Sequence, residues 1–390
     1  MKMPIANSHR GFSLLELMVA STIGLIAIVA MTSLFRTGMN ATFTVTQRAE
    51  TQQNMRAAIE LMTKDISMAG AGLPSGGLQL ATTGGNSKVA CNQAGTCYVP
   101  ADTYPTGNYM YGLLPGFGNG VQSGTTITSA PGATNDSVTS IYCDYNFPLT
   151  NFSFTFPSTT QATVGPPIAP AVVIAGLPTN ILAPGGLNVG DLMFFLVTTP
   201  GPGTAGSVQG TSSAQTAAVV AEITGLPNNT TIDFATGDAL NFNQTGANSL
   251  ANTITTLGPA LGGGNAVTAC RLNAVTYFLQ VPLAGGTVQT PRLMRQVNGL
   301  TAVPVADNII NLQFSYDVIS STGGLMNANL ANPIAVGDSP ALIQKVNMWV
   351  MGQSLVSSGS RFQSMYLASS VSTGNMSFCN SYSSNTTVCQ

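Results

Sequence analysis

Hydrophobic residues form one long run near the start of the chain. Residues 12–35 read FSLLELMVASTIGLIAIVAMTSLF and hold a single charged residue, Glu16. At about 1.5 Å per residue, a helix of this length spans roughly 36 Å, which is enough to cross a hydrocarbon core of about 30 Å. The run therefore predicts a membrane-spanning helix.

A short polar segment, MKMPIANSHRG, precedes the run and ends at Gly11. The apolar run is too long for a secretory signal with its short hydrophobic core and small-residue cleavage site. An ordinary uncleaved anchor explains the length of the run but not the acid inside it, because an unpaired charge in lipid costs several kcal/mol. The position of Glu16 therefore needs a second explanation.

The segment GFSLLEL, which begins at Gly11, resembles the signature of type IV prepilins and type II secretion pseudopilins. The resemblance implies that a prepilin peptidase cuts between Gly11 and Phe12 and methylates the new N-terminal Phe12. It also implies that Glu16, the fifth residue after the cut, takes part in assembly. The leader would be residues 1–11, and residues 12–35 would be the transmembrane half of the N-terminal helix.

An amphipathic helical pattern continues over residues 36–69. Apolar side chains recur at helical period from Met55, at the following positions: Ile59, Met62, Ile66 and Ala69. Charged side chains occupy other positions, namely Arg56, Glu60, Lys64 and Asp65. Glu60 and Lys64 lie four residues apart and are expected to pair on the exposed side. The apolar stripe predicts packing against the protein's own head, and Gly70 and Gly72 end the helix.

After residue 72, short strand-like runs alternate with turns, up to the C-terminus. The clearest runs are 191–198, 217–224, 273–281, 292–297, 308–319, 343–351 and 361–367. In one of them, Leu312, Phe314, Tyr316 and Val318 alternate with polar residues, as in a half-buried strand. We therefore predict an α+β fold, in which the long N-terminal helix packs on a β-rich antiparallel-sheet head with long loops, residues 70–390.

Three further stretches resemble PilW-type minor pilins: SMAGAGLP, the series RLNAVTYFLQ, PRLMRQVNGL and ADNIINLQFSYDV, and IQKVNMWVMGQS. Residues from about 75 to 260 carry no such resemblance. The resemblance implies a minor pilin of a type IV pilus-like machine that helps to initiate or cap filament assembly. A pseudopilin of a type II secretion or competence system, and a pilus-tip adhesin or binding module, remain alternatives.

This resemblance also implies the partners and the location of the protein. The partners would be the prepilin peptidase, other minor and major pilins, and the inner membrane, with a surface ligand of the head in the adhesin alternative. The chain would cross the inner membrane once, with its head in the periplasm, and would then enter a cell-surface pilus.

Composition and charge agree with an extracytoplasmic β-rich protein. Only 7% of the 390 residues are charged, against roughly 25% in ordinary soluble domains. The net charge is −2 and no run of Lys or Arg occurs, so no nucleic-acid partner is predicted. An even cysteine count fits an oxidising compartment. The candidate disulfides are Cys379 with Cys389, Cys91 with Cys97, and Cys143 with Cys270; buried free thiols are the alternative.

The sequence gives no candidate catalytic, cofactor or metal site, so the protein is not expected to be an enzyme. Its single histidine, His9, lies in the leader. The cysteines lack C-x-x-C spacing, and the acids form no calcium loop. Gly116, Gly118 and Gly120 lack the lysine and helix of a phosphate-binding loop and are expected to form a turn.

Overall fold

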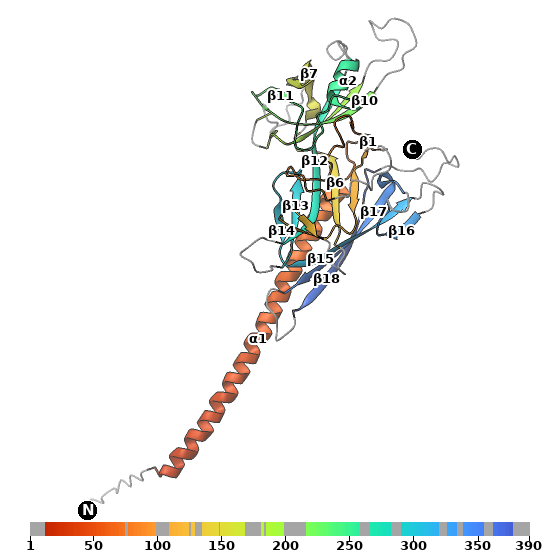
Figure 1. The fold of residues 1–390 in the computed structure, drawn as a ribbon. Coiled ribbons are helices and arrows are strands. Elements are labelled where there is room, and N and C mark those ends of the chain that lie inside the picture. Colours follow the sequence, from red (N-terminus) through yellow and green to blue (C-terminus); the bar gives the residue numbers. More distant parts are fainter. Residues whose placement is uncertain are drawn as a thin grey trace, which may run out of the picture.

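The computed structural model describes residues 12–74, 77–98, 109–124, 126–128, 135–147, 149–167, 181–182, 185–198, 216–257, 266–281, 290–319, 326–333, 338–354 and 362–376. A long helix carries a β-rich head at its C-terminal end (Figure 1). This arrangement confirms the predicted α+β class with a long N-terminal helix.

Helix α1, Leu14–Ser67, is one uninterrupted element of 54 residues, roughly 81 Å long at 1.5 Å per residue. Its first half projects away from the head, and its last turns lie against the strands (Figure 1). Gly70 and Gly72 follow it with φ of 80° and 77°, a region that glycine adopts without steric cost. The helix ends at Ser67, two residues before the predicted end at Ala69.

A nine-stranded sheet forms the centre of the head. Its strands are β3 (Leu113–Gly116), β4 (Val121–Ser123), β5 (Thr126–Thr128), β6 (Ser137–Cys143), β9 (Leu192–Thr198), β10 (Thr216–Glu222), β12 (Ala266–Val281), β13 (Arg292–Val297) and β14 (Val303–Ala306). The axis is β12, which pairs antiparallel with β9, β6 and β13 along its length. Its end pairs with β4 in parallel, an exception to the predicted antiparallel pattern.

A four-stranded antiparallel sheet lies beside the helix. In spatial order its strands are β16 (Met326–Leu330), β15 (Ile309–Ile319), β17 (Ile343–Gln353) and β18 (Ser364–Ser372). Leu312, Phe314 and Tyr316 on β15 are buried. They share one hydrophobic core with Met55 and Met62 of α1. The predicted packing of an alternating strand on the apolar stripe is thus confirmed.

The head contains several sheets, whereas the strand pattern predicted a single antiparallel sheet. A three-stranded sheet and a short helix form a lobe at the end of the head farthest from α1 (Figure 1). Its elements are β7 (Phe152–Ser158), β8 (Gln161–Pro167), β11 (Thr231–Asp233) and α2 (Leu250–Leu257), and the head also holds β1 (Leu78–Gln79), β2 (Tyr109–Met110) and the 3₁₀ turns Leu149–Asn151 and Pro340–Leu342. Among the described residues, the core of the lobe is shared with side chains of β9, β10 and β12 and contains no side chain of α1.

Candidate functional site: the N-terminal anchor and its seat in the head

The start of α1 is fixed by a reciprocal pair of hydrogen bonds. The Glu16 N–H donates to Ser13 Oγ at 3.2 Å, and the Ser13 N–H donates to Glu16 Oε2 at 3.4 Å. This is the capping box that a Ser-x-x-Glu sequence forms at a helix N-terminus. Glu16 is thus both the predicted assembly residue and part of the helix cap. Phe12, next to the cap, is 83% exposed, whereas Gly11 lies outside the described residues.

The capping role of Ser13 was readable from the sequence but was not part of the prediction. A serine followed three residues later by glutamate, just before an apolar run, is a recognised signal for a helix start. The acid also lies in the first turn, where it interacts favourably with the helix dipole. Glu16 therefore has a local partner before any second subunit is present.

The first half of α1 is a strongly apolar, unburied cylinder. Residues 17–35 contain no charged side chain, and an 18-residue window of the helix reaches a mean hydropathy of 2.3 with none of it buried. Hydroxyl groups within this half bond back to the helix: Thr22 Oγ1 donates to Val19 O at 2.8 Å and Thr32 Oγ1 to Ile28 O at 2.7 Å. Such self-satisfied hydroxyl groups lower the cost of placing the segment in lipid.

The second half of α1 packs closely against the head. The buried part of the helix, between Thr51 and Ile66, is called its seat. Met55, Met62 and Ile66 are fully buried. Strand β17 approaches the helix at Gly352, where an added Cβ would lie 2.8 Å from Thr51 Cγ2 and 3.0 Å from Met55 Sδ. A side chain at this position would therefore push the helix away from the sheet.

Asp65 is a charged residue of the helix that lies off the apolar stripe and is nevertheless buried. It is 2% exposed and faces the central sheet rather than solvent. Its carboxylate accepts hydrogen bonds from Tyr142 Oη at 2.8 Å, Tyr277 Oη at 2.6 Å and Arg295 Nε at 2.8 Å. Helical periodicity alone did not reveal this, because its partners come from β6, β12 and β13, far away in the sequence. No ion pair between Glu60 and Lys64 is present among the described residues.

The environment of Asp65 shifts the ionisation of its three partners. Burial, and next the charge of Asp65, raise the pKa of Tyr142 and of Tyr277 well above the ordinary value. Burial lowers the pKa of Arg295, but the hydrogen bond and charge of Asp65 outweigh this effect and raise it. The two tyrosines therefore stay neutral donors and the arginine stays charged, as a fully satisfied buried carboxylate requires.

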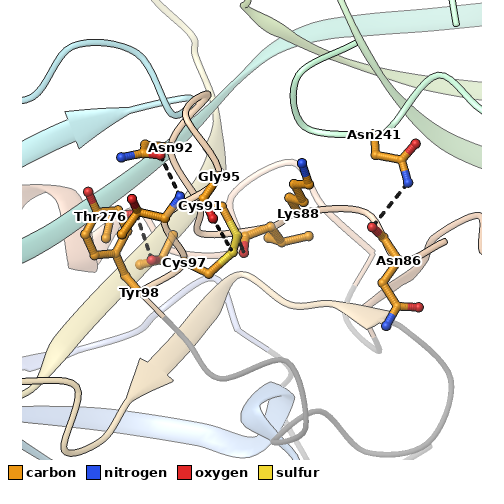
Figure 2. The surroundings of a disulfide bond; sticks show 12 residues. Asn86, Lys88, Cys91, Asn92, Gly95, Cys97, Tyr98, Asn241 and Thr276 are labelled. Atoms are coloured by element: carbon orange, nitrogen blue, oxygen red, sulfur yellow. Dashed lines mark hydrogen bonds between the residues drawn. A yellow bond between two sulfur atoms is a disulfide. The ribbon is translucent and has the colours of Figure 1, made fainter. Parts of the chain in front are cut away.

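Two disulfides cross-link the described part of the head, and one of them lies beside the end of α1. Cys143 on β6 is bonded to Cys270 on β12, and a Cβ on Gly72, just after α1, would lie 2.6 Å from Cys143 Sγ. Cys91 is bonded to Cys97 (Figure 2). These are two of the three pairs considered from the sequence; Cys379 and Cys389 lie outside the described residues.

The loop closed by Cys91 and Cys97 is also held by hydrogen bonds (Figure 2). Within it, the Thr96 N–H donates to Asn92 Oδ1 at 2.8 Å. Beside it, Asn241 Nδ2 donates to the carbonyl of Asn86 at 3.3 Å, which ties the segment to the region after β11. In the part of the chain that the structure describes, no three His, Cys, Asp or Glu side chains gather as metal ligands.

These features define a class of protein: a single-pass, membrane-anchored subunit whose helix is apolar and exposed in its first half and carries a β-rich head on its second. A family model described as the prokaryotic N-terminal methylation motif matches residues 6–32. This motif supports a type IV pilin-like protein that is processed by prepilin peptidase and assembles with other pilins. The match covers the second half of the leader and most of the membrane segment, and leaves the head outside it.

The comparison with curated proteins and the comparison with solved structures find no match to this chain. The motif class is typically structural rather than enzymatic. The particular machine and the role within it must therefore be argued from the architecture of the chain.

Proposed function

We propose that this chain is a PilW-like minor pilin that helps to initiate or cap a type IV pilus-like filament. The observation that carries the proposal is the lobe at the end of the head farthest from α1 (Figure 1). In a filament whose subunits stack along their helices, a lobe in this position would occupy the space of the next subunit. Only a subunit at the end of the filament has that space free.

In this proposal the leader, residues 1–11, is removed and Phe12 becomes the methylated N-terminus. The exposed cylinder of residues 12–35 anchors the chain in the inner membrane and then enters the filament core. Residues 36–69 join it to a periplasmic head, residues 70–390. Glu16 is the one charge in the apolar cylinder, and it pairs with the terminal amine of Phe12 or with that of a neighbouring subunit.

Mass spectrometry of the membrane-extracted protein tests the processing step. We expect N-methylated Phe12 as the first residue, and the leader retained in a Gly11→Val variant, because a branched side chain then stands at the cleaved bond. Asn7→Ala, in the same leader, is the control and should be processed normally. An intact Met1 in the wild-type protein would refute cleavage at this site.

The abundance of the chain in sheared filaments tests the terminal position. A subunit confined to the filament end should be present at a small fraction of the main subunit, and its deletion should lower the number of filaments rather than their length. If this chain is instead the dominant subunit of sheared filaments, the terminal role is wrong.

A further inference from the structure

The four-stranded sheet presents one face to α1 and the other face to solvent, and the outer face is hollowed. Leu312, Phe314 and Tyr316 point to the helix, so the residues between them on β15 point away from it. A depression of about 660 Å³ lies on this outer side. This volume falls within the range of roughly 300–1,000 Å³ that is usual for small-molecule sites.

Strand register arranges the side chains of this hollow in two rows. In the first row, Trp349 on β17 stands between Gln313 on β15 and Ala368 on β18. In the second row, Asn347 stands between Ser315 and Ser370. All six residues line the hollow. The floor is therefore built from amides, hydroxyls and one methyl group, with a single large aromatic ring at one end.

The aromatic end forms a platform at the rim. The ring of Trp349 stacks on Tyr366, with centroids 6.1 Å apart and planes at 27°. Tyr366 is 71% exposed, and Phe117, which also lines the hollow, is 42% exposed. Flat aromatic faces of this kind combine an apolar surface with, for Trp and Tyr, a polar edge.

The polar groups are held in place by their neighbours. Asn347 Nδ2 donates to Asp317 Oδ1 and to Asn329 Oδ1, each at 3.1 Å. These bonds fix the plane of the Asn347 amide at the centre of the second row. An amide held in this way offers directional hydrogen bonding to a ligand at little entropic cost.

The hollow offers no free charge to a ligand. Among the described residues that line it there is no lysine or arginine. The one carboxylate, Asp136, is buried and accepts hydrogen bonds from the N–H groups of Gly118 at 2.8 Å and Phe314 at 2.9 Å. Just outside, Lys345 pairs with Asp317 at 3.6 Å. A phosphate or carboxylate ligand would therefore find no counter-charge.

A peptide strand would not find a partner in the hollow either. Strands β15 and β17 are paired on both sides, so their backbone N–H and C=O groups are already used in the sheet. Recognition must come from side chains alone.

From this chemistry we propose that the hollow binds a neutral oligosaccharide. A sugar ring presents a face of C–H groups, which fits the Trp349 and Tyr366 platform, and a rim of hydroxyls. These hydroxyls can donate to Asn347 Oδ1, whose N–H groups are already used, and can exchange hydrogen bonds with the Ser370 hydroxyl. The proposal concerns the outer face of the head and does not rest on the filament role.

The test uses the purified full-length chain in detergent. Trp349 is the single tryptophan of the chain, so its emission reports on the hollow directly. An array of neutral oligosaccharides, together with sialylated glycans, oligogalacturonate and single-stranded DNA, selects a probe. Titration with a neutral trisaccharide from that array should then change the emission in a saturable way.

Two variants locate the binding. Ser370→Phe fills the floor, and Asn347→Ala removes the central amide; each should weaken binding of the trisaccharide at least tenfold, with an unchanged thermal unfolding midpoint for Ser370→Phe. Tyr145→Ala, which removes a 63% exposed aromatic ring outside the hollow, should bind as the wild type does. Binding to no neutral glycan, binding only to the anionic probes or DNA, or wild-type affinity for the trisaccharide in both hollow variants would overturn the proposal.

Discussion

Glu222 on β10 is a carboxyl group whose surroundings favour the neutral form. It is 3% exposed, and its Oε2 accepts the Leu240 N–H at 2.9 Å. Burial, and then the neighbouring Asp238, raise the pKa of Glu222 to about 7, although the Leu240 N–H and Lys88 act in the opposite direction. The acid therefore releases its proton more readily in the unfolded chain than in the folded one.

This shift makes the stability of the head depend on pH, and Glu222→Gln tests it. The pKa of Glu222 is higher in the folded chain than in the unfolded chain. The contribution of this group to the free energy of unfolding is therefore full below about pH 4.5 and is lost as the pH rises through 7. At about 1.4 kcal/mol per pH unit, the loss is on the order of 3 kcal/mol. The amide of glutamine can accept from Leu240 and donate to Asp238, so the variant should lose most of this pH dependence.

Thermal unfolding of the detergent-solubilised chain between pH 4 and pH 8, followed by Trp349 emission, measures the effect. Glu50→Gln, an exposed acid on α1, is the control and should keep the wild-type slope. Burial also raises the pKa of Asp136 and of Asp191, so a residual slope of the same sign is expected. An unchanged slope in Glu222→Gln would contradict the assignment.

At the scale of elements, the seat of α1 depends on one buried acid, Asp65. Asp65→Asn removes the charge while keeping the shape, so Arg295 loses its counter-ion and the two tyrosine hydroxyls share one acceptor oxygen. Breaking a buried pair in this way typically costs about 3–5 kcal/mol. We expect a lower unfolding midpoint and easier proteolysis near the end of α1.

Glu60→Gln is the matched control for Asp65→Asn, since it makes the same acid-to-amide change on the exposed side of the same helix. It should alter the unfolding midpoint very little, as exposed charges contribute roughly 0–1 kcal/mol. Equal midpoints for Asp65→Asn and wild type would show that the helix is held by apolar packing alone.

Elements with a clear period were predictable from the sequence, and elements without one were not. The stripe from Met55 and the alternation around Phe314 follow from periods of 3.6 and 2. Strand β6 gives no such signal, because every residue from Ser137 to Cys143 is buried, including its polar side chains. Strands β1 to β5 contain only two to four residues each, too few for a periodic pattern.

The candidate site was predictable to the extent that it is local in sequence. Glu16 lies within the apolar run, and Ser13, which caps the helix, precedes Glu16 by three residues. Asp65 could not be assigned in the same way, because Tyr142, Tyr277 and Arg295 come from three strands whose meeting depends on the whole fold. The disulfide between Cys143 and Cys270 spans 127 residues and depends on the fold for the same reason.

For the whole molecule, a disulfide joins two paired strands of the central sheet, β6 and β12, beside the end of the helix. Closure of the Cys143–Cys270 loop corresponds to about 5 kcal/mol in the chain-entropy description, and the same region carries Asp65 and Gly72. The lobe, the central sheet and the seat are thus joined through β12. The seat is therefore the connection between the head and the membrane half of α1.

The last prediction concerns Glu16, whose carboxylate is expected to gain a counter-charge when the chain docks into a filament. A carboxylate within a membrane segment costs about 2.5–3.5 kcal/mol on insertion scales when it lies at the helix centre. Among the described residues of the unprocessed single chain, its carboxylate accepts one hydrogen bond, from the Ser13 N–H at 3.4 Å. Docking beside a terminal amine would relieve that cost, so Glu16→Ala should be processed and membrane-bound yet depleted from sheared filaments.

Loss of the helix cap is the competing explanation, and Glu16→Gln separates the two. Glutamine keeps the capping box but carries no charge. If the charge drives docking, Glu16→Gln should be depleted from filaments as strongly as Glu16→Ala, while Glu50→Ala, farther along the same helix, should assemble normally. If glutamine restores assembly, the acid acts only through the cap. Equal amounts of all forms in the membrane fraction, measured by immunoblot, ensure that the filament fraction reports docking and not expression.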